Sequence, residues 1–366
     1  MRNDLNAMPR CPLVSVIIPM YNSARFISQT LESLTYQTMK NFEVIVVDDC
    51  STDTGVEIVE SFSKRFGGRL RVVKFSKNSG TPALPRNVGI QFARGKYLAF
   101  LDSDDLYTKT ALEELTTLAE KYQAEGVHTD EYFAPFNGKI KSADDPAFTD
   151  MNELTNPGNL STEYVSKYHP DKPTFLTEDL GERVKKYLGG GGYFSGRPYL
   201  TLWKRDFLIA EQITFPNLRI HEDQIYGLHC LFLAKKILRV PNICYIHRQR
   251  TDSITFERLN IDVAIHKSLR MFIDGFNELM KIMSDIKFFG EHPDYRYAVL
   301  NWYVQSKFYH LQGIYAQVHP VAFNSLVEKE FHSTDAAFSA YLFNTVNIQH
   351  FQIMRLQNEL NKFKQR

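Results

Sequence analysis

Residues 97–105 read YLAFLDSDD, a short apolar run that passes directly into three carboxylates. Such a run is too short for a buried helix and is typical of a strand covered on both faces. Two earlier stretches have the same form, LVSVIIP over 13–19 and FEVIVVDD over 42–49. Each of these predicted strands is followed by polar side chains at the point where it ends.

The chain between these strands has the spacing of helices. Phe26, Ile27, Leu31 and Leu34 recur on one helical face, as in an amphipathic helix that packs on a sheet. Strands that alternate with such helices predict a mostly parallel sheet flanked by helices, whose ligands bind beyond the carboxyl ends of the strands. The other elements we expect are helices over 24–37, 82–94 and from an N-cap at Ser51 or Thr52 to Arg65, and a strand over 70–75.

The later part of the chain has a different pattern. Residues 136–172 are rich in Asn, Asp, Pro, Ser and Thr and predict a long irregular excursion, and Gly189–Gly192 predicts a loop edge. Helical spacing then dominates to the end of the sequence. We expect an α/β domain over 1–257, with halves at about 13–125 and 126–257, and a helical region over 258–366 with helices at 259–283, 295–315 and 338–363.

Composition excludes several classes of protein. The 366 residues carry 43 Lys and Arg against 42 Asp and Glu, so no overall basic field points to nucleic acid. The four cysteines show neither CxxC pairs nor metal-finger spacing, which favours reduced thiols in a cytoplasmic protein. The longest uncharged run, residues 336–354, is too polar to span a membrane, and the first residues lack the apolar stretch of a secretory signal.

The acidic run at 102–105 calls for a compensating charge. Carboxylates held close together repel one another unless a cation or strong donors offset them, and Mg²⁺ or Mn²⁺ prefers such oxygen ligands. A solvated turn that caps the next helix is the alternative. The sequence has no GxGxxG after its first strand and no GxxxxGK[ST], so phosphates would be held by metal and basic side chains.

These stretches together resemble a known family. VSVIIPMYNSARFISQTLESLTYQ, FEVIVVDDCSTD and NSGTPALPRNVGIQFARGKYLAFLDSDDLY are similar to glycosyltransferase family 2, the large inverting family with the GT-A fold. TLWKRDFL, HEDQIYG and YIHRQRTDSIT continue the resemblance in the same order. It implies a GT-A sheet with a C-terminal helical extension.

The resemblance implies a nucleotide pocket at the first strand ends. Pro19 and Tyr21 would line the base pocket, with Tyr21 against the nucleobase, and Asp49 would accept from the base imide nitrogen. Arg86, in the PRN segment, would contact the nucleotide from the side. A surface residue on an amphipathic helix is the alternative for Arg86.

Asp102 and Asp104 match the DxD motif of the family. The resemblance places Asp102 and Ser103 with the donor and makes Asp104 the direct ligand of Mn²⁺ or Mg²⁺, with Asp102 as a further candidate. Asp105 would hold sugar hydroxyls or cap the next helix. His247 is a candidate third ligand, and a structural hydrogen-bond donor is its alternative.

Asp223 matches the family's general base. Inverting transfer is a single displacement in which the acceptor loses a proton as it attacks, so a carboxylate must face the leaving diphosphate across the sugar. The resemblance also implies that Arg250 and Ser253 close over the diphosphate. Glu222 and Trp203 are candidates for the acceptor side. The alternatives are a helix opened by two acids for Glu222-Asp223 and a core residue for Trp203.

The function implied is metal-dependent transfer of a sugar, with a UDP-sugar favoured as donor, to a glycan, lipid-linked or protein acceptor. A nucleotidyltransferase, or a nucleotide-sugar-binding module without activity, is the alternative. Three roles are open for the basic end at 355–366: packing on the core, dimerisation of the helices, or peripheral contact with the inner face of a membrane.

Overall fold

A computed structural model describes residues 11–129, 133–134, 161–162, 170–189, 194–248 and 261–315. The sequence predictions that lie outside these residues include the helix at 338–363, the basic end at 355–366, most of the irregular excursion at 136–172 and most of the loop edge at Gly189–Gly192.

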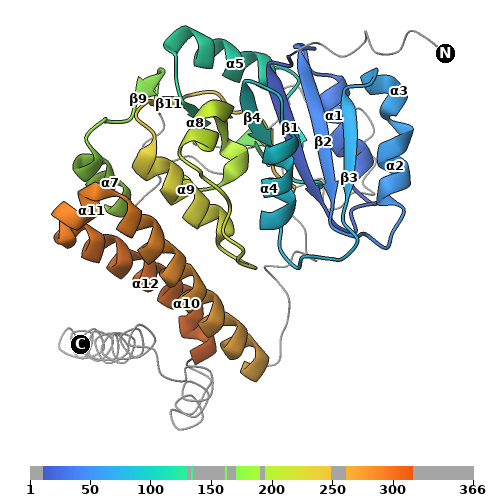
Figure 1. The fold of residues 1–366 in the computed structure, drawn as a ribbon. Helices are drawn as coiled ribbons and strands as arrows, with labels where there is room; N and C mark the ends of the chain where they lie inside the picture. The colour runs from blue at the N-terminus through green and yellow to red at the C-terminus, as the bar shows by residue number, and fades with distance from the viewer. Residues whose placement is uncertain are drawn as a thin grey trace, which may run out of the picture. The chain divides into compact units, whose positions relative to one another are not determined.

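Eight of the described strands form one sheet in the order β3-β2-β1-β4-β10-β6-β11-β9 (Figure 1). The first four are parallel, β10 runs antiparallel to both of its neighbours, and β11 returns parallel to β6. The predicted mostly parallel sheet is therefore confirmed, with β10 reversed inside it and β9 reversed at its edge. The strands are β1 (Val14–Met20), β2 (Phe42–Asp48), β3 (Leu70–Lys74), β4 (Tyr97–Phe100), β6 (Gly126–Thr129), β9 (Thr174–Phe175), β10 (Thr201–Lys204) and β11 (Ile237–Val240).

The register of the central strands brings their polar ends together. Met20 at the end of β1 pairs with Asp48 at the end of β2. On the other side of β1, Ile17 pairs with Phe100, so continuing that register sets Asp102 level with Pro19. Every residue of β1 and β2 is buried, as expected for strands covered on both faces.

Helices cover both faces of these strands (Figure 1). Helix α4 (Ala83–Phe92) packs on β1 and β2, and its Gly89 lies against Ile17, where a Cβ atom would stand 2.3 Å from Ile17 Cγ2. The alternate residues of β1 pack with α1 (Ile27–Thr35), which covers the opposite face. This alternation explains why apolar residues fill β1 without a break.

The predicted helix from Ser51 or Thr52 to Arg65 differs from the structure. Two helices, α2 (Gly55–Ser61) and α3 (Ser63–Phe66), occupy this region, and neither has a side-chain N-cap. The Ser51 hydroxyl instead accepts a hydrogen bond from the Asn22 N–H at 2.9 Å. Asp53 bonds the Ala24 N–H at 2.7 Å, so the polar residues before α2 hold the turn after β1.

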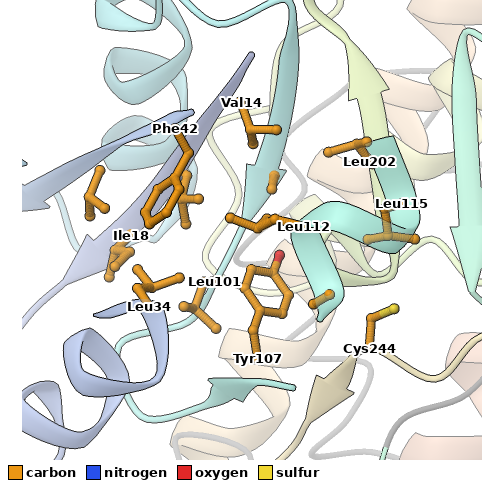
Figure 2. Close-up of a cluster of buried hydrophobic side chains, with 14 of the residues drawn as sticks. Val14, Ile18, Leu34, Phe42, Leu101, Tyr107, Leu112, Leu115, Leu202 and Cys244 are labelled. Carbon is orange, nitrogen blue, oxygen red and sulfur yellow. The ribbon is translucent and has the colours of Figure 1, made fainter. Parts of the chain in front are cut away.

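The buried core lies between the sheet and the helices on the α1 side (Figure 2). Helix α5 (Ala111–Tyr122) follows the acidic run of 102–105 and contributes Leu112 and Leu115 to this core. The side chains labelled in Figure 2 come from strands, helices and the residues next to them across the α/β part of the chain: Val14, Ile18, Leu34, Phe42, Leu101, Tyr107, Leu112, Leu115, Leu202 and Cys244.

A second, smaller sheet joins distant parts of the sequence. Its order is β5 (Leu106–Tyr107), β12 (Tyr245–Ile246), β7 (Phe133–Ala134) and β8 (Ser161–Thr162). Strand β12 runs antiparallel to β5. The residues that follow the acidic run therefore lie beside those that precede the RQR segment.

The remaining described elements are mainly helical. They are α7 (Leu180–Leu188), the 3₁₀ turn η3 (Pro198–Leu200), α8 (Arg205–Ala210), α9 (Glu222–Leu233), α10 (Ile261–Asp285), α11 (Lys287–Glu291) and α12 (Pro293–Tyr315). Helices α10 and α12 confirm two of the predicted C-terminal helices.

The chain divides into two compact units. One is Met1–Phe256 with Lys281–Val299, and the other is Glu257–Met280 with Leu300–Arg366. The domain limits expected from the sequence, 1–257 and 258–366, stay a prediction. Within the described ranges, none of the helices combines the length and the apolar character that crossing a membrane requires.

Candidate functional site

The guanidinium of Arg86 joins two acidic segments that are far apart in the sequence. Its Nη2 lies 2.9 Å from Asp102 Oδ1, and its Nη1 lies 2.8 Å from Glu222 Oε1. Arg86 is only 5% exposed, and its guanidinium lies 5.3 Å from the centre of the Phe215 ring. The surface alternative for Arg86 is wrong, because a buried cation must be paired and two carboxylates pair with this one.

The charges of this cluster act on one another. Burial alone would lower the pKa of Arg86, but the charges of Asp102, Glu222 and Asp223 outweigh it and raise the pKa. Burial and the charge of Asp223 raise the pKa of Glu222 to about 7, although Arg86 acts in the opposite direction. Arg86 is therefore a fixed cation, whereas Glu222 gains and loses its proton near neutral pH.

Asp223 lies in the first turn of α9, beside Glu222. Residue His221 adopts a left-handed conformation, with φ 71°, and the helix begins at Glu222. Asp223 is half-buried, and its Oδ1 accepts from the Gln224 N–H at 2.7 Å. Two acids at a helix N-terminus suit the helix dipole, so the helix start predicted here is confirmed.

The turn before α9 is fastened to the start of α4. The Thr81 hydroxyl donates to the Leu218 carbonyl at 2.5 Å, and the same oxygen accepts from the Ala83 N–H at 3.2 Å. The acid-bearing start of α9 is thus held against the element that carries Arg86.

The predicted base pocket lies at the ends of β1 and β2. Asp49 is buried, and its carboxylate accepts from Ser79 N–H at 2.8 Å and from Ser79 Oγ at 2.9 Å. Pro19 is buried within β1, whereas Tyr21 is 50% exposed just beyond it. The exposed ring of Tyr21 is accessible for stacking, and the buried carboxylate lies at the adjacent strand end.

Asp105 has a structural position that the sequence reasoning missed. It is 1% exposed, and Oδ2 accepts from the Tyr245 hydroxyl at 2.5 Å, while Oδ1 accepts from the Arg248 N–H at 2.7 Å. The role in holding sugar hydroxyls is therefore wrong, and α5 begins only at Ala111, so Asp105 caps no helix. Strand β12 brings these donors to Asp105.

His247 also contacts Asp105. Its Nδ1 lies 3.1 Å from Asp105 Oδ2, and its side chain is 37% exposed. Burial would lower the pKa of His247, but the hydrogen bond to Asp105 and the charges of Asp105, Asp102 and Asp104 together raise it. This is the structural contact that the sequence left as an alternative to metal binding.

The rest of the acidic run is more accessible. Asp102 and Asp104 are half-buried. Ser103 instead turns toward the protein: its Oγ lies 2.7 Å from Ser23 Oγ, and its carbonyl accepts from the Thr30 hydroxyl at 3.0 Å. A donor contact through the Ser103 hydroxyl would compete with the Ser23 bond.

The donor set fits a hard divalent cation that the substrate helps to bind. In the described part of the chain, no three His, Cys, Asp or Glu side chains are grouped so that they hold a metal by themselves. Mg²⁺ is commonly bound by one or two carboxylates together with substrate phosphates and water. Asp102 and Asp104 supply two carboxylates at one strand end, which matches that requirement.

Two residues expected on the acceptor side are buried. Trp203 lies in β10, is 1% exposed and stacks on Phe207 at 5.6 Å, so it is a core residue. It is buried because β10 runs between β4 and β6, which the sequence did not indicate. Glu222 is 6% exposed and paired with Arg86, so it too is not open to an acceptor. Arg250 and Ser253 lie outside the described residues.

Sequence reasoning also missed Tyr187 of α7. Its side chain is hydrogen-bonded to Gln224 and lies within electrostatic range of Asp223, and burial is the main cause that raises its pKa. No local pattern in the sequence signals this contact.

Comparison with solved structures identifies the class of fold. The S. aureus TarS fragment 1–349, crystallised with UDP-GlcNAc, superimposes with a TM-score of 0.53 at 23% identity, covering 71% of this chain and 66% of that chain. The same fragment with UDP gives a TM-score of 0.52 at 22% identity, over 73% and 65% of the two chains. With its sheet order and flanking helices, the chain has the GT-A type of fold.

Sequence comparison gives the family. The family model for glycosyl transferase family 2 matches residues 15–161. The resemblance to this family that the sequence motifs indicated is therefore confirmed over residues 15–161. A poly(ribitol-phosphate) beta-glucosyltransferase of Bacillus spizizenii is 30% identical over 245 residues, which cover 65% of this chain and 32% of that protein. An uncharacterized glycosyltransferase of Bacillus subtilis, EpsJ, is 29% identical over 245 residues, 67% of this chain and 63% of its own. The chain thus spans about a third of the first relative.

Proposed function

We propose that this protein transfers a sugar from a UDP-sugar to a growing cell-surface glycan or polyol-phosphate polymer. The observation that carries this proposal is the cluster of Asp102, Arg86, Glu222 and Asp223, which brings the donor-side strand end next to a half-buried carboxylate at a helix start. The names of two relatives, a poly(ribitol-phosphate) glucosyltransferase and the poly(ribitol-phosphate) N-acetylglucosaminyltransferase TarS, support this acceptor class.

Asp223 is the general base of the proposed reaction. An acceptor hydroxyl passes its proton to the Asp223 carboxylate while its oxygen bonds to the anomeric carbon. The bond from that carbon to the diphosphate oxygen breaks in the same step, and the nucleoside diphosphate leaves with the bonding electrons. Attack opposite the leaving group inverts the anomeric configuration. Asp223 lies in the first turn of α9, where the positive end of a helix dipole suits a negatively charged side chain.

In the proposed reaction, residues at the ends of the strands bind the donor. The exposed ring of Tyr21 would stack on the base, and the Asp49 carboxylate would accept from its imide nitrogen. Asp102 and Asp104 would hold Mg²⁺ or Mn²⁺ together with the diphosphate. The ion supplies positive charge against the charge that develops on the leaving group.

We also place the reaction inside the cell. Cys11, Cys50, Cys230 and Cys244 are all unpaired, and Cys230 and Cys244 are buried. Unpaired thiols suit a reducing compartment, which supports this location.

A panel of nucleotide sugars tests the proposal. Purified protein is mixed with UDP-, GDP- and dTDP-sugars and Mn²⁺, with and without poly(ribitol phosphate), and the release of nucleoside diphosphate is followed by luminescence. We expect UDP from one or two UDP-sugars, stimulated by the acceptor and lost on adding EDTA. Formation of UTP and sugar 1-phosphate from a UDP-sugar and added pyrophosphate, with no release of UDP, would indicate a nucleotidyltransferase. Thermal stabilisation by a UDP-sugar without any turnover would indicate a binding module.

A further inference from the structure

We propose that Arg86 is a positioning residue that couples the donor-side carboxylate Asp102 to the catalytic base through Glu222. The inference rests on the proposed function of Asp223 and deepens it. It replaces the direct nucleotide contact that the sequence suggested for Arg86, because the two Nη atoms of this side chain each bind a carboxylate of the protein.

The geometry of the guanidinium fixes both carboxylates at once. Its planar fork gives one arm to Asp102 and the other to Glu222, at 2.9 and 2.8 Å. Because the side chain is buried, water does not replace either partner without cost. Glu222 and Asp223 are adjacent in the first turn of α9, so the arm that holds Glu222 also sets where Asp223 stands.

The two partners of Arg86 differ in their access to solvent. The side chain of Asp102 is 28% exposed, whereas that of Glu222 is 8% exposed. A donor that approaches the strand ends therefore reaches Asp102 first. When Asp102 turns toward the donor or its metal ion, its hold on Arg86 weakens, and the cation is left to Glu222 and the nearby Asp223. Donor binding is in this way transmitted to the base.

A lysine at this position would preserve the charge but not the bridge. Its single ammonium group has no planar fork, so it does not hold two carboxylates in the same fixed directions. Arg86→Lys therefore separates the bridging role from simple charge compensation. Glu222→Ala removes the arm on the base side, and Glu222→Gln keeps an oxygen that accepts from Arg86 Nη1.

The test is a double-mutant cycle on Arg86→Lys and Glu222→Ala, with Glu222→Gln as the conservative variant. Donor dissociation constants for the active UDP-sugar come from calorimetry, and kcat comes from transfer to the acceptor. We expect Arg86→Lys to lower kcat about tenfold while the donor dissociation constant changes about threefold or less. On the Glu222→Ala background the same change should lower kcat by about twofold or less. Glu222→Gln should keep most of the wild-type kcat.

A matched control is available at the other end of β2. Glu43 is 1% exposed and paired with Arg94 and Arg71, so Glu43→Gln changes another buried pair of the same chemistry. It should lower stability and leave kcat at the wild-type value. Circular dichroism and thermal melting check the fold of each variant.

The outcomes separate the coupling from the proposed function. Equal loss of kcat from Arg86→Lys on both backgrounds, or a tenfold weaker donor with unchanged kcat, overturns the coupling alone. If Arg86→Lys does not fold, the comparison of the two Glu222 variants decides, and a wild-type kcat in Glu222→Ala overturns it. A wild-type protein that releases nucleoside diphosphate from no donor overturns the proposed function and the coupling together.

Discussion

Asn87 forms two hydrogen bonds with the main chain of Phe215. Its Oδ1 accepts from the Phe215 N–H and its Nδ2 donates to the Phe215 carbonyl, both at 2.8 Å. Asn87 follows Arg86 on α4, and the segment that begins at Phe215 leads to the start of α9. Two consecutive side chains of α4 thus hold the acid-bearing turn, one through its charge and the other through the backbone.

Replacing Asn87 should loosen this turn. Asn87→Ala leaves a donor and an acceptor of the Phe215 main chain without their partner, which should lower the free energy of unfolding by about 1–3 kcal/mol. Asn87→Asp retains the acceptor but sets a carboxylate oxygen against the Phe215 carbonyl, so it should be at least as destabilising. Urea denaturation measures both. An Asn87→Ala protein as stable as wild type would show that the bonds to Phe215 contribute nothing.

The sequence predicted the strands and their polar ends because those features are local. Each strand is an unbroken apolar run, and the register of parallel strands then places Tyr21, Asp49 and Asp102 at one edge. The pairing of Arg86 with Glu222 was not predictable in this way, since the two residues are 136 positions apart in the sequence and meet only where α9 packs beside α4. The same holds for Asp105, whose donors arrive on β12.

Burial was the other property that local patterns misjudged. Trp203 stands between Leu202 and Lys204, in a strand too short to show an alternation, and only the neighbours β4 and β6 make it a core residue. Ser51 is a residue type that is common at N-caps, but its hydroxyl accepts a hydrogen bond from the Asn22 N–H in the turn after β1. In both cases a partner distant in the sequence decided the outcome.

The two proposed roles of the acidic residues predict opposite kinetic effects. Asp223→Asn removes the base without changing the donor pocket, so transfer should fall by about 10²–10⁴-fold while the donor dissociation constant stays within about twofold. Asp104→Ala should instead weaken donor binding in Mn²⁺ and have little effect on donor binding in EDTA. Calorimetry and transfer assays on the same preparations distinguish these patterns. Normal turnover by Asp223→Asn would refute the assignment of the base.

Glu222 should make the protein less stable as the pH rises. Its pKa is about 7 in the folded chain, against 4.5 as its ordinary value. Between these two values the folded chain holds a proton that the unfolded chain has released, so the contribution of Glu222 is complete below pH 4.5. It falls, by up to about 3 kcal/mol, as the pH rises through 7.

Glu222→Gln removes this dependence, so the stability of the variant relative to wild type should increase from pH 4.5 to 7 and then stay level. Glu43→Gln is the control with the opposite sign. Burial alone would raise the pKa of Glu43. Its hydrogen bonds to Arg94 and Ser15 and the charge of Arg71 outweigh burial, so the pKa is lowered. The stability that Glu43 gives is present above pH 4.5 and lost below it. Urea unfolding at a series of pH values measures both, and parallel curves for wild type and Glu222→Gln would contradict the prediction.

Close packing of two glycines supports the base side of the site. A Cβ at Gly227 of α9 would stand 2.3 Å from Gly196 Cα and 2.8 Å from the Gly196 carbonyl oxygen. Both contacts are with backbone, so no side chain can rotate away to relieve them. Gly227→Ala should therefore force the segment at Gly196 away from α9, at a cost of about 1–3 kcal/mol in the free energy of unfolding.

Gly290 in α11 offers the matched control, because a Cβ there would meet nothing within 4 Å. Gly290→Ala should be neutral or stabilise the protein by up to about 1 kcal/mol, since alanine favours a helix over glycine. If Gly227→Ala displaces the segment, transfer should also fall, because Gly196 packs on the main chain of Asp223, where a Cβ at Gly196 would stand 3.3 Å from the Asp223 carbonyl oxygen. Equal unfolding curves for the two variants would mean that the gap between α9 and the Gly196 segment adapts without strain, and the packing would then have no part in placing the base.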